Sequence, residues 1–170
     1  EGRAGRYDAR SLEIQRLIGR SLRSAVNLRQ LPEVTLWVDC DVIDADGGTR
    51  TTAINGASVA LFDALTSLQR AGRLPHWPMD GLVSAISVGM VRSEMLVDLD
   101  YREDSGADVD LNVVFLSDGR LVEVQGSAEG QPFSVEQLTE MVERARAACC
   151  EIELLQRATL GLPAPESGVS

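Results

Sequence analysis

The sequence predicts an α+β fold in which helices pack on a mixed or mostly antiparallel sheet. Apolar residues recur at helical spacing in three segments and alternate with polar residues in several others. Short turn signals, Arg92-Ser93 and Asp118-Gly119, join successive alternating segments, as hairpins do. The length of 170 residues, 44% hydrophobic and 25% charged, is typical of a single globular domain spanning 1–170.

The first half of the chain is predicted to form helix, strand and helix. A helix is expected from Arg10, with an apolar stripe made of Ile14, Leu17, Ile18, Leu22, Ala25 and Val26. Alternation over Val34–Ile43 predicts a strand, which leads into a glycine turn at 44–50. The following helix, Thr51–Gly72, carries so little charge that we expect most of its surface to be buried.

The second half is predicted to form two hairpins and a long helix. The expected strands are Leu82–Val91, Glu94–Leu99, Leu111–Leu116 and Leu121–Ser127. An acidic loop, Asp100–Asp110, separates the hairpins. Ser134 and Gln137 form a capping box that begins the last helix, whose stripe should comprise Leu138, Met141, Val142, Ala145, Cys149, Ile152 and Leu155. We expect a mobile segment over 1–9 and a disordered tail over 162–170.

Hydropathy and charge argue against a membrane-spanning protein and against a broadly basic surface, but they permit a local anion-binding site. The longest uncharged apolar stretches, Thr51–Phe62 and Gly81–Val91, are too short for the roughly 20 residues of a membrane span. The net charge of −10 argues against a generally basic, nucleic-acid-binding surface. However, residues 1–29 carry a net charge of +4 and all basic residues are arginines, which permits a local anion site on an acidic body.

The turn before the second helix has the chemistry of an anion site. Glycines allow close approach of the backbone, and unpaired amides at a helix start attract negative charge. Thr49 would add a hydroxyl group and Arg50 a guanidinium group suited to phosphate, next to Gly48. The same residues are equally typical of a plain strand-to-helix turn with Thr49 as its cap, and both interpretations stay open.

The acidic loop is a candidate cation site. Its carboxylates, Asp98, Asp100, Glu103, Asp104, Asp108 and Asp110, would repel one another without a cation or arginine. Oxygen ligands of this kind suit Mg²⁺ or Mn²⁺, and Asp108 and Asp110 should share one strand face. On the residues alone, a solvated loop on an acidic protein is the favoured interpretation.

Other catalytic arrangements find little support. The single histidine, His76, lies between prolines and is expected at a surface or interface, without a G-x-S-x-G motif elsewhere. Cys40, Cys149 and Cys150 lack the spacing of a zinc site or a disulfide framework. We interpret the cysteines as small core or interface residues in a reducing cytosol.

Four segments together resemble the ribonuclease PH family of bacterial phosphorolytic 3′→5′ exoribonucleases. They are Arg10–Arg23, Trp37–Arg50, Asp98–Asp110 and Val122–Phe133, and the likeness spans about residues 10–158. The resemblance implies a ribonuclease PH-like fold, of the ribosomal protein S5 domain 2-like type. Family members carry several strands before the position of Arg10, so the chain is expected to be incomplete at its N-terminus.

The resemblance also implies roles for individual residues. Arg10, Gly48, Thr49 and Arg50 would bind inorganic phosphate, the co-substrate. Asp104 and Asp110 would be the catalytic carboxylates beside Mg²⁺ or Mn²⁺, with Asp108 as a further possible ligand. Phosphate would attack the last internucleotide phosphorus and release a nucleoside diphosphate.

The implied partners are RNA, especially the 3′ ends of tRNA precursors, and five further copies of the chain. Family members form homohexamers built as trimers of dimers, and the resemblance implies a cytoplasmic protein that works in tRNA and rRNA processing. Two alternatives remain: a catalytically inactive, RNA-holding subunit of the same fold, and a hydrolytic nuclease that uses two metal ions.

Overall fold

The structure is a computed structural model that describes residues 9–165. The elements, in chain order, are α1 (Ala9–Ser24), a 3₁₀ turn η1 (Leu28–Gln30), α2 (Thr49–Arg70), β1 (Val83–Val91), β2 (Glu94–Val97), α3 (Tyr101–Ser105), β3 (Val109–Leu116), β4 (Leu121–Ala128) and α4 (Val135–Leu160). The segments expected to be mobile or disordered, 1–9 and 162–170, lie mostly outside the described residues. Within the described range, no helix is both long and apolar enough to cross a membrane.

The four strands form one antiparallel sheet in the order β2-β1-β3-β4, which confirms the predicted fold class. Arg92 and Ser93 both have positive φ angles, 52° and 68°, as the tight turn between β1 and β2 requires. Gly119 supplies the positive φ of 84° in the turn between β3 and β4.

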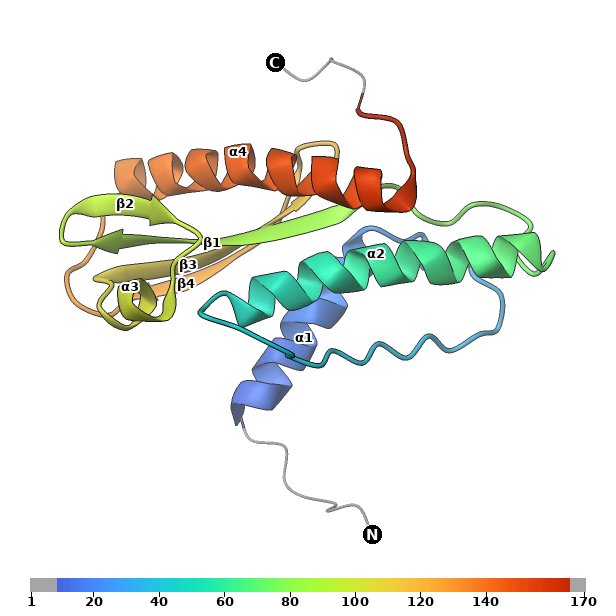
Figure 1. The fold of residues 1–170 in the computed structure, drawn as a ribbon, viewed down its shortest axis with the longest axis horizontal. Coiled ribbons are helices and arrows are strands. Elements are labelled where there is room, and N and C mark those ends of the chain that lie inside the picture. The colour runs from blue at the N-terminus through green and yellow to red at the C-terminus, as the bar shows by residue number, and fades with distance from the viewer. Residues whose placement is uncertain (1–8, 166–170) are drawn as a thin grey trace, which may run out of the picture.

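Helices cover both faces of the sheet (Figure 1). On one face, α4 packs Met141, Ala145 and Cys149 against the side chains of β1 and β3 that point toward it. On the other face, α1 and α2 pack Leu17, Ile54 and other apolar residues. The alternation of strand side chains divides β3 between these two layers, so both faces of this strand are buried.

The sheet face that α1 and α2 cover is apolar at one end and polar at the other. Its apolar end contains Val83, Ala85, Val114 and Leu116. Two residues further along each strand, the residues that face this side are Ser87, Asn112 and Gln125. After two more residues, they are Gly89, Asp110 and Ser127. A polar, incompletely covered corner therefore lies at the start of β3.

The expected strand at Val34–Ile43 is wrong. The segment has no regular secondary structure, and Figure 1 shows it as an irregular trace alongside α2. Trp37 and Ile43 are 87% and 98% exposed, and hollows of about 940 and 740 Å³ border the segment. A strand needs hydrogen-bonding neighbours as well as alternation, and no strand within residues 9–165 pairs with this one.

The helix α2 is buried along one face only, which corrects the expectation that most of its surface is covered. Ile54, Leu61 and Leu65 face the core. Small residues such as Gly56 and Ala60 lie on the exposed side, next to the larger hollow. The low charge of this helix was therefore not a sign that most of its surface is buried.

The expected acidic loop contains a short helix, α3, and β3 begins two residues earlier than predicted. Asp100 caps α3 by accepting hydrogen bonds from the amides of Arg102 and Glu103, at 2.7 and 2.8 Å. Glu103 accepts one from the amide of Asp100 at 3.0 Å, which completes a capping box. Two of the loop's carboxylates are thus used to fold it.

The last helix ends its buried stripe with polar residues. The capping box of Ser134 and Gln137 is confirmed. Leu155, however, is 69% exposed, whereas Glu153 and Gln156 are buried. The expected stripe was wrong at its C-terminal end because the backbone of a strand, rather than apolar side chains, lies beneath this part of α4.

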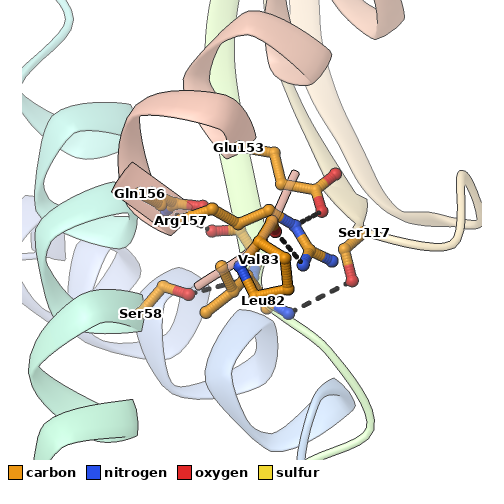
Figure 2. Close-up of polar contacts among 8 residues, drawn as sticks. Ser58, Leu82, Val83, Ser117, Glu153, Gln156 and Arg157 are labelled. Atoms are coloured by element: carbon orange, nitrogen blue, oxygen red, sulfur yellow. Dashed lines mark hydrogen bonds and ion pairs between the residues drawn. The ribbon is translucent and has the colours of Figure 1, made fainter. Parts of the chain in front are cut away.

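Figure 2 shows what these buried polar residues do. Gln156 Nε2 donates to the carbonyl oxygens of Val83, at 2.9 Å, and Asn55, at 3.1 Å. The amide of Val83 in turn donates to Ser58 Oγ at 2.9 Å. The side chain of Gln156 therefore joins α4, α2 and the first residue of β1, where backbone groups would otherwise be buried without partners.

We predict that Gln156→Ala destabilises the protein by about 1–3 kcal/mol, because it leaves the buried carbonyl group of Val83 without its side-chain donor. Leu155→Ala, one position away on the exposed side, should change the free energy of unfolding by at most about 0.5 kcal/mol. Urea denaturation of both variants measures the difference. Equal losses would show that the polar contact is not what stabilises this end of the helix.

Candidate phosphate-binding and carboxylate site

The turn before α2 is held directly against the segment that leads into α3. Gly47 has a φ angle of 114°, and a Cβ atom there would lie 2.3 Å from the carbonyl oxygen of Leu99. Only glycine permits this approach. The contact brings the start of α2 next to the acidic segment, although about 50 residues of sequence separate them.

The start of α2 has no side-chain cap. Its N-cap residue is Gly48, in a left-handed conformation, and the hydroxyl group of Thr51 donates back to the Gly48 carbonyl at 2.9 Å. Thr49 is the first helical residue, so the interpretation of a plain turn capped by Thr49 is wrong. The first amides of α2 remain available to an anion at the positive end of the helix.

Arg50 interacts with two negatively charged side chains. Its guanidinium nitrogen Nη2 is 3.6 Å from Glu13 Oε2 on α1, and its side chain is only 26% exposed. Its charge also lowers the pKa of Asp110 on β3, opposing the groups that raise it. The guanidinium therefore contacts helix α1, and its charge acts at the polar corner of the sheet.

Asp110 is the most perturbed carboxyl group of the corner. Burial raises its pKa, and the charges of Asp104 and Glu129 raise it further. Its Oδ1 atom is buried and has no hydrogen-bond partner among residues 9–165. A half-buried acid with an unpaired oxygen and a second carboxylate beside it is an arrangement that an oxygen-seeking cation would stabilise.

The other predicted site residues differ in their placement. Asp104 lies on the exposed side of α3 and acts on Asp110 through its charge. Arg10 is exposed in the first turn of α1, three residues before Glu13 and so on the same helix face. Asp108 is turned toward another loop, since a Cβ atom at Gly130 would lie 2.7 Å from its Oδ1 atom. The charges of Arg50 and Asp104 thus act on Asp110, and Asp108 as a further ligand stays a prediction.

Three residues of the site escaped the sequence analysis: Glu13, Gln125 and Glu129. Gln125 Nε2 donates to Glu13 Oε1 at 2.8 Å across 112 residues of sequence, and Glu129 adds negative charge near Asp110. Spacing on a single element could not reveal such contacts. The one local signal was the position of Glu13, a helical turn after Arg10.

The cysteines do not supply an activated nucleophile. Burial in the core raises the pKa of Cys149 to about 11, so its thiol stays protonated. Partial burial, together with Asp39 and Asp41, raises the pKa of Cys40. Cys149 is a core residue as predicted, whereas Cys40 and Cys150 are exposed in the described structure.

Two family models match the chain. Residues 1–66 match domain 1 of the 3′ exoribonuclease family, and residues 81–148 match domain 2 of the same family. The gap between the matches falls in the segment from the end of α2 to just before β1.

Solved structures share the fold at low sequence identity. Rice (Oryza sativa) Rrp46 is 23% identical, with a TM-score of 0.69 over 92% of this chain and 68% of that one. The Archaeoglobus fulgidus exosome with RNA bound to the active site is 18% identical, with a TM-score of 0.64 over 91% and 64%. An archaeal exosome core is 20% identical, with a TM-score of 0.62 over 89% and 64%. The chain spans about two thirds of the length of these structures.

We predict that Asp110→Asn stabilises the protein at neutral pH, by on the order of 0.5 kcal/mol once solvent screening is allowed for. The folded protein holds the Asp110 proton more tightly than the unfolded chain does, so wild-type stability is lost as the pH rises above about 4. The advantage of the variant should therefore vanish below that pH. Thermal unfolding from pH 3 to pH 8 measures it.

Asp118→Asn is the matched control, with the opposite sign. Desolvation opposes the shift, but hydrogen bonds and charge from Arg120 lower the pKa of Asp118 overall. That variant should lose stability relative to the wild type as the pH rises toward about 4. A destabilised Asp110→Asn variant at pH 7 would contradict the assignment of a strained carboxylate.

Proposed function

Because the chain belongs to the 3′ exoribonuclease family, we propose that it shortens RNA from the 3′ end by phosphorolysis, with inorganic phosphate as the attacking group. One observation carries the proposal. An uncapped helix start with Arg50 lies beside the Asp104–Asp110 pair, at the same corner of the sheet. Such a corner offers a binding site for a small anion. Next to it lies a pair of carboxylates that could hold a cation beside the reacting phosphodiester.

The anion side of the corner would bind phosphate. The first amides of α2, the Thr49 hydroxyl group and the Arg50 guanidinium are hydrogen-bond donors, and they suit a phosphate dianion. We assign Gly48 to this site as well, since it is the N-cap residue in a left-handed conformation that glycine favours, and Arg10 on α1 as a second guanidinium group. When phosphate is bound here, it no longer has to meet the RNA phosphodiester by diffusion. The reaction between the two anions then becomes effectively unimolecular.

The proposed step is an exchange at phosphorus. A phosphate oxygen forms a bond to the last internucleotide phosphorus, and the bond from that phosphorus to the 3′ oxygen of the preceding nucleotide breaks. The proton of the attacking hydrogen phosphate passes to the leaving 3′ oxygen, so the products are a nucleoside diphosphate and RNA that is one nucleotide shorter. Arginine side chains offset the repulsion between the reacting anions.

The carboxylate side of the corner fits Mg²⁺ or Mn²⁺ as a cofactor. Within residues 9–165, no three acidic, histidine or cysteine side chains are grouped as a metal site. Mg²⁺ usually takes one or two carboxylates and completes its shell with water and substrate phosphate oxygens. Asp104 and Asp110, with its unpaired Oδ1, would hold the ion. When bound, it would neutralise charge on the transferred phosphoryl group and the leaving oxygen.

We extend the proposal to the expected partners. The substrate would be RNA, with the 3′ ends of tRNA precursors as its main class, in a cytoplasmic homohexamer built from three dimers. The similar Archaeoglobus fulgidus exosome has RNA bound to its active site, which supports RNA as the substrate class. The acidic chain would bind it through a few arginines and a cation rather than through a broad basic face.

A second candidate is a non-catalytic subunit that holds RNA in a larger assembly. Two of the similar structures are archaeal exosomes, which favours considering it. A third, hydrolysis, would use water in place of phosphate. The phosphate dependence of the products separates the three.

We predict that the protein degrades a 3′-tailed RNA in the presence of Mg²⁺ only when phosphate is added. The labelled products should be nucleoside diphosphates, resolved by thin-layer chromatography. Monophosphates formed with or without phosphate would replace phosphorolysis by hydrolysis. RNA binding without degradation, measured by filter binding, would support the non-catalytic subunit.

We also predict that Arg50→Ala raises the KM for phosphate at least about tenfold while the Kd for RNA changes by less than about threefold, because Arg50 binds the co-substrate. Arg146→Ala is the matched control. Arg146 forms an ion pair with Glu143 on α4, the helix that covers the other sheet face. A collapse of RNA affinity with the phosphate KM unchanged would show that Arg50 binds RNA instead.

A further inference from the structure

Glu13 makes two contacts with its two carboxylate oxygens. Oε2 lies 3.6 Å from Arg50 Nη2, and Oε1 accepts a hydrogen bond from Gln125 Nε2 at 2.8 Å. The side chain thus connects α1, α2 and β4 at the polar corner. A carboxylate with one oxygen anchored to the sheet can present the other in a fixed position.

Arg50 needs such a contact because a second carboxylate competes for it. Asp110 is half-buried, has an unpaired oxygen and feels the charge of Arg50. Asp104 and Glu129 make that side more negative still. Glu13 is the carboxylate that contacts the guanidinium directly, and it holds this group against α1.

We infer that Glu13, anchored by Gln125, is a positioning residue that holds the Arg50 guanidinium at the start of α2 so that it can bind phosphate. The inference rests on the proposed phosphate site and extends it to a residue that touches neither phosphate nor RNA. Glu13 acts through Arg50, whose Nη2 lies 3.6 Å from Glu13 Oε2.

The sign of the effect distinguishes positioning from simple electrostatics. Glu13 is an anion close to a site for an anion. If its charge acted only through space, its removal would strengthen phosphate binding. If it positions Arg50, its removal weakens phosphate binding, since a misplaced guanidinium group loses its contacts with the anion.

The test begins with Glu13→Gln, which keeps an oxygen that can accept the hydrogen bond from Gln125 and removes the charge that faces Arg50. We expect the KM for phosphate to rise roughly tenfold or more. The kcat at saturating phosphate and the KM for RNA should change by less than about threefold, because the reacting groups are unchanged. The Kd for phosphate, measured by calorimetry, should follow the KM.

The matched control is Glu123→Gln. Glu123 also links β4 to α1, through Arg20, whose Nε donates to Glu123 Oε2 at 2.9 Å, and the charge of Glu13 acts on Arg20 as well. This variant therefore removes the charge of an α1–β4 ion pair that does not include Arg50. It should leave the phosphate KM within about twofold of the wild type.

A double-mutant cycle with Arg50→Ala separates positioning from a loss of folding. When Arg50 is absent, Glu13→Gln should raise the phosphate KM no further, whereas a purely structural loss would add to that of Arg50→Ala. An unchanged or lower phosphate KM in Glu13→Gln, or additivity in the cycle, would overturn the inference. Failure of the proposed function is seen separately, as a wild-type protein that neither binds phosphate nor requires it.

Discussion

The structure of this site depends on the balance of charge around one guanidinium group. Arg50 contacts Glu13, and its charge also acts on the half-buried Asp110. Each carboxylate comes from a different element, so α1, α2 and β3 must all be in place before the arginine has a defined position. The excess of negative charge near Asp110 is tolerable only if cations, from the chain or from solution, offset it.

The fold creates this balance because one face of the sheet is apolar at one end and polar at the other. Toward the apolar end, side chains of β1 and β3 meet α1 and α2 in a dry core. At the other end, Asp110, Asn112, Gln125 and Ser127 face the same side. Gly47 then brings the open start of α2 to this end by direct backbone contact. Packing of the core and placement of the site are thus two results of one arrangement.

Local patterns predicted the elements well where each depends on its own residues. The helix from Arg10, both hairpins and the capping box at Ser134 are confirmed. Prediction failed where an element depends on a neighbour. Val34–Ile43 alternates as a strand does, but no strand in the described part of the chain pairs with it. Leu155 has the spacing of a core residue, but the neighbouring strand end needs hydrogen bonds, which Gln156 supplies.

The amino-acid sequence alone determined the fold class and the turn residues, because periodicity and glycine chemistry are local properties. The resemblance to a known family singled out Arg50, Asp104 and Asp110 among the candidate groups. Only the tertiary structure decided which of these groups act on one another. It removed Thr49 as a cap and introduced Glu13 and Gln125, which lie 112 residues apart. Electrostatic interactions depend on distance in space, and that distance is set only when helices and strands pack.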